Sequence, residues 1–254
     1  MRKESALILS QECLAEDIYS MWIQTELAKE SMPGQFISVF TKDGSKLLPR
    51  PISLCEIETD KLRIVYRVTG EDTGTKQFAR MRAGEILSIM GPLGNGFPLT
   101  VEPEGKALLI GGGIGIPPML ELAKQLEKEK KLVMGYGSEQ FLTQELQEQG
   151  PLYISTEDGS TGTKGNVLDV LQEYQLQADV IYACGPTPML RAIKQYAEEK
   201  KIACYLSLEE KMACGIGACL ACVCQSTEKD EHSNVKNKRI CKEGPVFLAT
   251  EVEI

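Results

Sequence analysis

The chain has 254 residues, of which 43% are hydrophobic and 25% are charged, a composition typical of a globular protein with room for two ordinary domains and a small appendage. Its net charge of -8 argues against nucleic acid as a partner, and no apolar run is long enough to cross a bilayer. Nine cysteines without an N-terminal apolar signal segment favour a reducing compartment, so we expect a cytoplasmic protein with no membrane contact.

The first part of the chain has the pattern of short strands. Apolar stretches at residues 19–25, 35–40 and 61–68 are separated by Gly, Pro and Asp, which favour turns. Residues 76–82 have the apolar spacing of one short helix. We therefore predict a first domain, residues 1–98, that is a small antiparallel β-barrel.

Two motifs in this domain suit a phosphate-containing flavin. The first combines a fixed positive charge, a rigid backbone and a hydroxyl in four residues: Arg50, Pro51, Ile52 and Ser53. An arginine can bind a pyrophosphate through two hydrogen bonds, and a nearby serine can bond a flavin ring nitrogen. Gly74 and Thr75 precede the short helix and offer backbone N–H groups for a second phosphate contact. Taken singly, these motifs are better explained by a solvated arginine beside an ordinary turn.

Strands and helices alternate beyond residue 104. The sequence predicts strands at residues 106–110, 132–136, 152–156, 179–183 and 204–208, and helices at 117–128, in the Gln/Glu-rich stretch after 136, and at 167–174 and 188–200. Repeated strand–helix units imply a parallel sheet with helices on both faces. We therefore predict a second domain, residues 99–206, with an open α/β nucleotide-binding fold.

Two loops of this domain are candidates for binding a dinucleotide. One follows the first strand and contains Gly111, Gly112, Gly113 and Gly115. The other follows the fourth strand and contains Cys184, Gly185 and Pro186. Ligands bind at the carboxyl ends of parallel strands, and missing side chains let a pyrophosphate approach the backbone. The glycine spacing departs from the strict Rossmann pattern, so a tight structural turn and a small buried cysteine are the alternatives.

The last predicted domain, residues 207–254, is rich in cysteine. Thiolates can enclose a metal cluster only if the backbone between them bends sharply, and Gly215 and Gly217 permit such a bend. The spacing of a plant-type 2Fe–2S cluster is reproduced by Cys214, Cys219 and Cys222. We therefore expect a one-electron carrier in this domain.

A cluster of this kind needs a fourth ligand, and Cys241 is the expected one. The polar residues 225–239 predict an exposed loop, and a turn sequence after Cys241 returns this residue to the cluster. Cys224 is then a spare thiol. Structural zinc and disulfides are the alternatives, but zinc sites usually have paired short spacings, and the single histidine, His232, excludes a Rieske centre.

The order of these motifs resembles the ferredoxin-reductase superfamily, in which a flavin-binding barrel precedes a pyridine-nucleotide domain. The glycine-rich residues 91–96 stand in the same order between the barrel motifs and the nucleotide loops. With the tail that begins at Glu209 and continues through Cys241 and Val246, the resemblance narrows to the electron-transfer subunits of NAD-dependent dihydroorotate dehydrogenase. It covers nearly the full length of the chain.

The resemblance implies a set of cofactor-binding residues. FAD would be bound by Arg50, Pro51, Ile52, Ser53, Tyr66, Arg67, Val68, Gly74 and Thr75, and the 2Fe–2S cluster by Cys214, Cys219, Cys222 and Cys241. Cys184 would lie near the nicotinamide of NAD, and no residue is assigned as an acid or base. Many relatives have an aromatic residue at the position of Ile52 and another at the C-terminus. This chain lacks both, so flavin stacking is expected from Tyr66 or from a partner.

The resemblance also implies a partner and a direction of electron flow. A catalytic subunit with FMN would oxidise dihydroorotate to orotate in pyrimidine synthesis, and two copies of each chain would form a heterotetramer. Electrons would pass from FMN through the cluster to FAD and then to NAD. The alternatives are a reductase subunit of another complex, such as a ferredoxin:NADP oxidoreductase or a sulfite reductase, and a non-enzymatic redox or zinc regulator.

NAD is preferred over NADP because of two acidic residues. Glu157 and Asp158 follow the predicted strand at 152–156, where NADP-using relatives typically have a basic residue. A carboxylate there would repel the 2′-phosphate of NADP. Solvated surface acids are the alternative interpretation.

Overall fold

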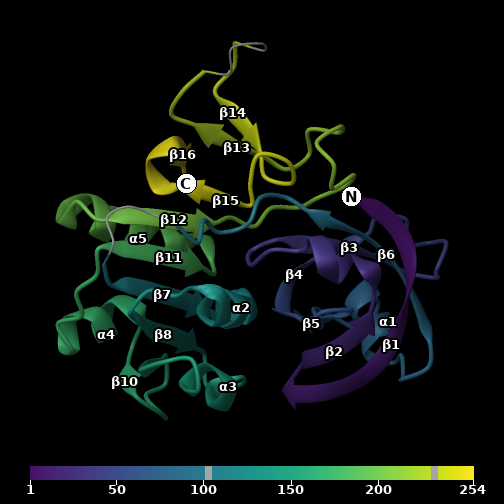
Figure 1. The fold of residues 1–254 in the computed structure, drawn as a ribbon, viewed down its shortest axis with the longest axis horizontal. Coiled ribbons are helices and arrows are strands. Elements are labelled where there is room, and N and C mark those ends of the chain that lie inside the picture. Colours follow the sequence, from purple (N-terminus) through teal and green to yellow (C-terminus); the bar gives the residue numbers. More distant parts are fainter. Residues whose placement is uncertain (101–104, 230–233) are drawn as a thin grey trace.

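The computed structural model describes residues 1–100, 105–229 and 234–254. The chain forms a closed barrel, a seven-stranded sheet with helices, and a three-stranded sheet near the C-terminus (Figure 1). The barrel and the seven-stranded sheet lie side by side, and the three-stranded sheet lies across one end of both (Figure 1). Within the described ranges no helix is both long and apolar enough to cross a membrane.

Six antiparallel strands close the barrel in the order β1–β2–β5–β4–β3–β6. Their bounds are Arg2–Ala15 for β1, Ile18–Gln24 for β2, Phe36–Phe40 for β3, Arg50–Ile57 for β4, Lys61–Arg67 for β5 and Ile86–Leu93 for β6. Alternate side chains such as Leu62, Ile64 and Tyr66 fill the barrel interior. The predicted antiparallel barrel is therefore confirmed.

The short helix of the barrel domain, α1, spans Gly74–Ala79. It begins two residues before the predicted start because the Thr73 side chain accepts the backbone N–H of Lys76 and caps the helix. The helix ends at Ala79, and Arg80 closes it through a backbone bond to the Gln77 carbonyl. A 3-10 turn, η1, spans Glu26–Glu30.

The seven-stranded sheet has the order β10–β9–β8–β7–β11–β12–β15. Its strands are β7 (Ala107–Gly112), β8 (Lys130–Tyr136), β9 (Leu152–Thr156), β10 (Thr163–Lys164), β11 (Val180–Cys184), β12 (Ala203–Ser207) and β15 (Val246–Leu248). All pairs are parallel except β12 with β15, which are antiparallel. The predicted parallel sheet is confirmed, with β10 and β15 added at its two edges.

Four helices cover the two faces of this sheet. They are α2 (Pro117–Gln125), α3 (Thr143–Gln147), α4 (Val167–Glu173) and α5 (Thr187–Lys200). One core joins Leu109 and Tyr182 of the sheet to α2 and α3, and the opposite core joins Ile110 and Ala183 to α4 and α5. Neighbouring residues of one strand face opposite cores, which explains why these strands are apolar throughout.

The C-terminal sheet consists of β14 (Asn237–Arg239), β13 (Val223–Ser226) and β16 (Val252–Glu253), and the 3-10 turn η3 spans Ala249–Glu251. The expectation that residues 225–239 form only a loop was wrong, because β13 and β14 pair as an antiparallel hairpin. Such pairing uses backbone groups, so polar side chains on an exposed edge do not prevent it. The middle of this segment, including His232, lies outside the described residues. The domain bounds at 98 and 206 stay a prediction.

Candidate functional site

The predicted flavin motifs meet on one side of the barrel. Arg50 and Ser53 lie on β4, which pairs with β3. A Cβ atom built on Gly74 would lie 2.9 Å from Arg50 Nε, so the arginine passes directly over the start of α1. Arg50 also donates to the carbonyl of Leu48. Arg50, Ser53 and Thr75 are all partly open to solvent, so a ligand can reach them.

Tyr66 has a different environment from the other predicted flavin residues. Its ring is buried in the barrel, stacked on Tyr19 at 6.1 Å and edge-on to Phe78 at 6.2 Å. Its hydroxyl donates to Gln11 at 2.9 Å. Burial raises the pKa of Tyr66 well above its usual range, so the hydroxyl stays protonated. This ring faces the barrel interior, so it presents no open face for a flavin.

The neighbouring residues Arg67 and Val68 divide between solvent and core. Val68 is buried and donates its backbone N–H to the Asp17 carbonyl at 2.8 Å. Arg67 is exposed at the end of β5 and points across the domain boundary. Its terminal nitrogen lies 3.7 Å from the position of a Cβ atom built on Gly113. Arg67 therefore joins the flavin side of the barrel to the first nucleotide loop.

The two nucleotide loops lie next to one another, as predicted. Cys184 pairs with Gly111 in the parallel register of β11 and β7, which brings both carboxyl ends to one edge of the sheet. A Cβ atom on Gly115 would lie 2.4 Å from the Cys184 carbonyl oxygen, and one on Gly112 would lie 3.2 Å from Pro186 Cδ. Close packing of the two loops therefore requires glycine at these positions. This agrees with the alternative stated above, that the glycines serve a tight structural turn.

Gly113 differs from the other glycines of its loop. It has a φ of +52°, and a Cβ atom built on it would lie 3.7 Å from the Arg67 nitrogen, with no closer contact to the described residues beyond its chain neighbours. Its backbone is therefore open on the side that faces the barrel. This opening fits the close approach of a pyrophosphate, whereas Gly111, Gly112 and Gly115 serve the loop packing.

Cys184 is 9% exposed and lies opposite Ser207 of β12. Burial raises the pKa of this thiol to about 12, and only the nearby Ser207 hydroxyl opposes the shift. The group is therefore a neutral thiol at physiological pH. It can pack against a ring, but it is neither a thiolate nucleophile nor a base.

Three of the four predicted cluster ligands lie on one tight loop, residues 214–222, which we call the cysteine loop. Cys241 lies against this loop. Backbone N–H groups point at their sulfurs: those of Ile216, Ala218 and Cys219 at Cys214 Sγ, between 3.3 and 3.4 Å, and that of Gly217 at Cys241 Sγ, at 3.0 Å. Gly215 and Gly217 have φ values of +70° and +81°, which allows the loop to turn its amides inward. The predicted bend is confirmed.

This amide cage favours a thiolate at Cys214. Partial burial opposes ionisation, but the bonds from Ile216, Cys219 and Ala218 outweigh it and lower the pKa of Cys214 to about 6. Cys241 is more deeply placed, and burial together with its neighbour Cys222 raises its pKa to about 12. A metal atom would deprotonate such a thiol on binding.

The sulfurs approach in two pairs. The Cys219 N–H lies 3.4 Å from Cys214 Sγ, and the Cys241 N–H lies 3.5 Å from Cys222 Sγ. In the part of the chain that the structure describes, no three His, Cys, Asp or Glu side chains are grouped to hold a single metal ion. Two pairs of thiols fit two metal atoms with two thiolates each, as in a 2Fe–2S cluster.

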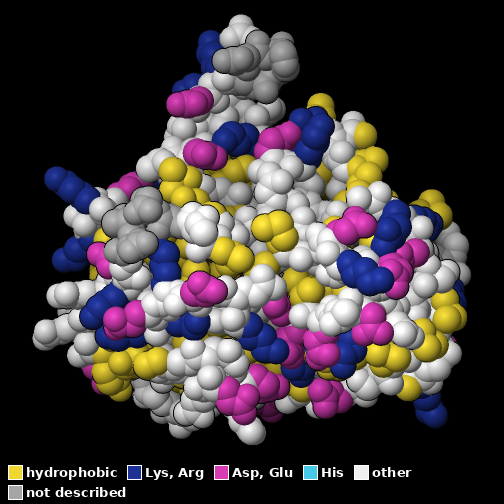
Figure 2. Space-filling model, viewed as in Figure 1, with side chains coloured by type: hydrophobic (Ala, Val, Ile, Leu, Met, Phe, Trp, Pro, Cys, Tyr) yellow, Lys and Arg dark blue, Asp and Glu magenta, His cyan; other side chains and the backbone are white. Residues whose placement is uncertain are grey.

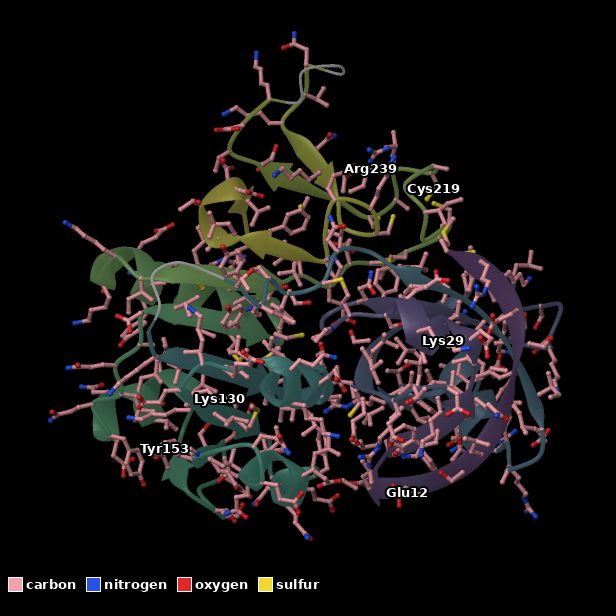
Figure 3. All side chains as sticks on the ribbon, in the orientation of Figure 1. Glu12, Lys29, Lys130, Tyr153, Cys219 and Arg239 are labelled. Atoms are coloured by element: carbon pink, nitrogen blue, oxygen red, sulfur yellow. The ribbon has the colours of Figure 1, made fainter. Side chains whose placement is uncertain are left out.

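Cys224 has another partner. Its thiol is half-buried in β13 and donates to the Lys238 carbonyl at 3.6 Å. Burial raises its pKa. All nine cysteines are free thiols, so the disulfide interpretation is not supported. Cys219, by contrast, is exposed, and Figure 3 labels it in the same C-terminal region as Arg239.

Several residues that hold the cysteine loop were not identified from the sequence. Arg239 forms an ion pair with Glu243 and donates to the Gly217 carbonyl at 3.1 Å. Asn95 donates its backbone N–H to Gly244 at 2.6 Å and its side-chain amide to Glu243 at 2.9 Å. The glycine-rich residues 91–96 were the available signal, because this segment docks onto the turn after Cys241.

The cysteine loop also packs on the barrel strand that pairs with the flavin motif. A Cβ atom on Gly215 would lie 3.0 Å from Ser38 Oγ. Ser38 of β3 in turn lies opposite Pro51 of β4. Only one strand therefore separates the cysteine loop from the residues predicted to bind flavin.

The outer side of the cysteine loop is apolar. Ile216, Leu220 and Val223 are 42%, 60% and 36% exposed. Figure 2 shows hydrophobic side chains gathered at the upper right of this face, where the cysteine loop lies, whereas acidic and basic groups are mixed over the rest. An exposed apolar patch beside a redox loop is typical of a surface that contacts another protein.

Comparisons with known proteins identify the family of the chain. The model of the iron-sulfur cluster binding domain of dihydroorotate dehydrogenase B matches residues 209–253. The electron transfer subunit of dihydroorotate dehydrogenase B (NAD(+)) from Geobacillus sp. (strain WCH70) is 44% identical over 99% of both chains. The corresponding subunit from Bacillus velezensis is 44% identical over 100% of both. The chain belongs to this family.

Solved structures confirm the fold expected of this electron-transfer family. An NADH-dependent reduced ferredoxin-NADP oxidoreductase, studied for flavin-based electron bifurcation, has a TM-score of 0.86 at 27% identity, covering 98% of this chain and 89% of that one. A flavohemoglobin from Malassezia yamatoensis with bound FAD and heme has a TM-score of 0.68 at 22% identity, covering 80% and 58%. The second likeness concerns the fold alone.

Proposed function

We propose that this chain is the NAD-linked electron-transfer subunit of a dihydroorotate dehydrogenase complex. Electrons would enter at the cysteine loop from a catalytic partner and leave at the nucleotide loops. The observation that carries the proposal is the amide-lined loop with four cysteines in two pairs, packed on the barrel beside the flavin motif. Membership of the family supports the same role.

The residues present fit three groups. Arg50, Ser53 and the backbone at Gly74 would hold FAD, and Gly113 with Arg67 would face NAD. The cysteine ligands of the 2Fe–2S cluster would be Cys214, Cys219, Cys222 and Cys241. When bound, the cluster supplies one-electron transfer and the flavin couples it to two-electron chemistry. The protein would bind and orient these groups, and Cys184 at this edge is a neutral thiol.

The partner would be an FMN-containing subunit that oxidises dihydroorotate, in a complex of two copies of each chain. The apolar patch of Ile216, Leu220 and Val223 supports a protein contact at the cysteine loop, where electrons from a partner must arrive. The nine free thiols support a reducing, cytoplasmic location. Co-purification of the native complex, followed by flavin analysis and mass measurement, tests the partner and the stoichiometry.

The cluster ligands are tested by two matched serine variants. Cys241→Ser removes a predicted cluster ligand, whose sulfur accepts the Gly217 N–H, so we expect iron, acid-labile sulfide and visible cluster absorbance to fall at least about tenfold. Cys224→Ser changes a thiol that is bonded to Lys238 and should retain wild-type iron content. Both variants should keep FAD, and NADH should still reduce it.

Electron transfer through the complex distinguishes this function from its alternatives. Wild-type complex should reduce NAD with dihydroorotate, whereas the Cys241→Ser complex should not, although NADH still reduces its flavin. Zinc in place of iron, or a ferredoxin as the only electron partner, would exclude the proposal.

A further inference from the structure

A buried ionic network joins the barrel to the nucleotide domain, and the predicted cofactor sites do not account for it. Arg63 of β5 is 5% exposed, and Glu56 of β4 is 7% exposed. Arg63 donates to Glu56 at 2.7 Å and to the Ser20 hydroxyl at 2.8 Å. These three residues belong to the barrel but lie on its outer side, against the second domain.

The nucleotide domain supplies the other half of the network from α2. Glu121 is 2% exposed and accepts the backbone N–H of Ile57, the last residue of β4, at 2.6 Å. Gln125 donates to its other oxygen at 2.7 Å. Lys124, one turn along the helix, pairs with Glu56 at the rim. Helix α2 therefore contacts strand β4 through two separate polar interactions.

Two further carboxylates extend the network at its edge. Glu145 of α3 and Glu12 of β1 each lie 3.4 Å from Arg63. Figure 3 shows Glu12 where the barrel meets the lower end of the nucleotide domain. Arg63 therefore contacts acidic groups from both domains at once.

The elements that carry this network also carry both predicted ligand sites. Strand β4 begins with Arg50, and β5 ends with Arg67. Helix α2 begins directly after the loop that contains Gly113. Because α2 and β4 are rigid, their mutual angle determines how far the open backbone of Gly113 lies from the flavin side of the barrel.

A buried ion pair adds little net stability compared with apolar packing, but it restricts the arrangements in which its groups are all satisfied. An apolar contact between α2 and β4 would tolerate sliding, whereas the Glu121 bond to the Ile57 N–H exists at one register only. The ionic character of this interface therefore suits a positioning role.

We propose that Glu56, Arg63, Glu121 and Lys124 form an interdomain network that sets the distance between nicotinamide and flavin. The inference rests on the proposed function, because it concerns how closely bound NAD approaches FAD. These are positioning residues, since none of them contacts the open backbone of Gly113. A misplacement of about 1 Å between reacting groups can slow a reaction about a hundredfold.

The test compares two substitutions of one buried residue in the complete complex. Glu121→Leu removes the acceptor for Ile57, whereas Glu121→Gln keeps an oxygen in its place. The exposed Glu127→Leu, just beyond α2, is the matched control. Three quantities are measured: hydrogen exchange of the segment with Ile57, the long-wavelength absorbance of the NAD–flavin contact, and single-turnover reduction of FAD by NADH.

We expect Glu121→Leu to retain FAD, iron and the dissociation constant for NADH within about threefold. Its Ile57 segment should exchange faster, its NAD–flavin absorbance should weaken, and FAD reduction should slow about tenfold. Glu121→Gln and Glu127→Leu should behave like the wild type. If Glu121→Leu does not fold, Lys124→Met at the rim should give a smaller slowing of about threefold.

Faster exchange at Ile57 with unchanged absorbance and unchanged FAD reduction would overturn the inference, since the network would then only join the domains. Equal slowing in the Leu and Gln variants would overturn it as well. A wild-type flavin that NADH cannot reduce would instead contradict the proposed function. The exchange measurement would still show whether Glu121 holds α2 against β4.

Discussion

At the scale of single residues, glycine has two different structural roles in the nucleotide domain. Gly115 packs against the backbone of the neighbouring loop, with its missing Cβ 2.4 Å from the Cys184 carbonyl and 2.6 Å from the Gly185 nitrogen. Gly113 instead faces open space beside Arg67. The same residue type thus holds the loops together at one position and leaves room for a ligand at another.

This difference predicts unequal effects of adding one methyl group. Gly115→Ala must displace backbone, so we expect a loss of about 1–3 kcal/mol in the free energy of unfolding and NAD binding weakened about tenfold. Gly137→Ala, directly after β8, meets no atom of the described residues within 4 Å other than its chain neighbours, and should change stability by less than about 1 kcal/mol. Urea unfolding and calorimetric titration with NAD check both, and equal effects would contradict the packing argument.

At the scale of elements, the ends of β8 and β9 place acidic groups at the nucleotide edge. The backbone N–H of Glu157 donates to the carbonyls of Tyr136 and Gly137 at 3.2 Å, which holds its exposed side chain beside the end of β8. Asp158 accepts the backbone N–H of Ser160 at 2.9 Å, and this bond lowers the pKa of its carboxyl. Both acidic side chains are exposed at the carboxyl end of β9, where we expect the adenosine end of a dinucleotide.

We expect the wild type to prefer NAD over NADP and Glu157→Arg to reduce that preference. An arginine at this edge would attract the 2′-phosphate, so NADP should bind about tenfold more tightly, by about 1.4 kcal/mol. Glu148→Arg makes the same charge change before the start of β9, at the opposite end of the strand, and should alter neither affinity. Titration of each nucleotide measures the effect, and a wild type that prefers NADP would refute the assignment.

At the scale of the whole molecule, three buried thiols couple folding to alkaline pH. Burial raises the pKa of Cys184 and Cys204 to about 12 and that of Cys55 still higher. Each folded-state pKa lies above the ordinary value of 9.0. The unfolded chain therefore loses these protons first, so their stabilising effect is complete below pH 9 and is lost as the pH rises toward 12.

The free energy of unfolding should consequently fall by about 1 kcal/mol for each of these thiols between pH 8 and pH 10. Cys204→Ala should remove one such contribution from the pH dependence, whereas Cys13→Ala, at an exposed position, should leave it unchanged. Urea unfolding at both pH values provides the measurement. An identical pH dependence in Cys204→Ala and the wild type would show that this thiol is not coupled to folding.

Local patterns accounted for most of the elements. Strand β9 has the predicted bounds of residues 152–156, because its apolar run and flanking turns lie within the strand itself. The hairpin of β13 and β14 was missed, since its strands are polar and are stabilised by pairing with each other and with β16. Strand β15 was missed for a related reason, because three residues form a strand only when an edge such as β12 is available.

The sequence by itself determined the chemistry of the ligands: cysteine spacing, glycine-rich turns after strands, and the order of barrel, nucleotide domain and cysteine tail. These features depend on residues close together in the chain. Only the tertiary structure decided that Arg67 lies near Gly113 and that the Cys224 thiol donates to the Lys238 carbonyl. The same holds for the hydrogen bond from the Ile57 N–H to the Glu121 carboxylate. The contacts of Arg67 and Glu121 join the barrel to the second domain, and the Cys224 contact joins two polar strands of one hairpin. No local sequence pattern encodes either kind of pairing.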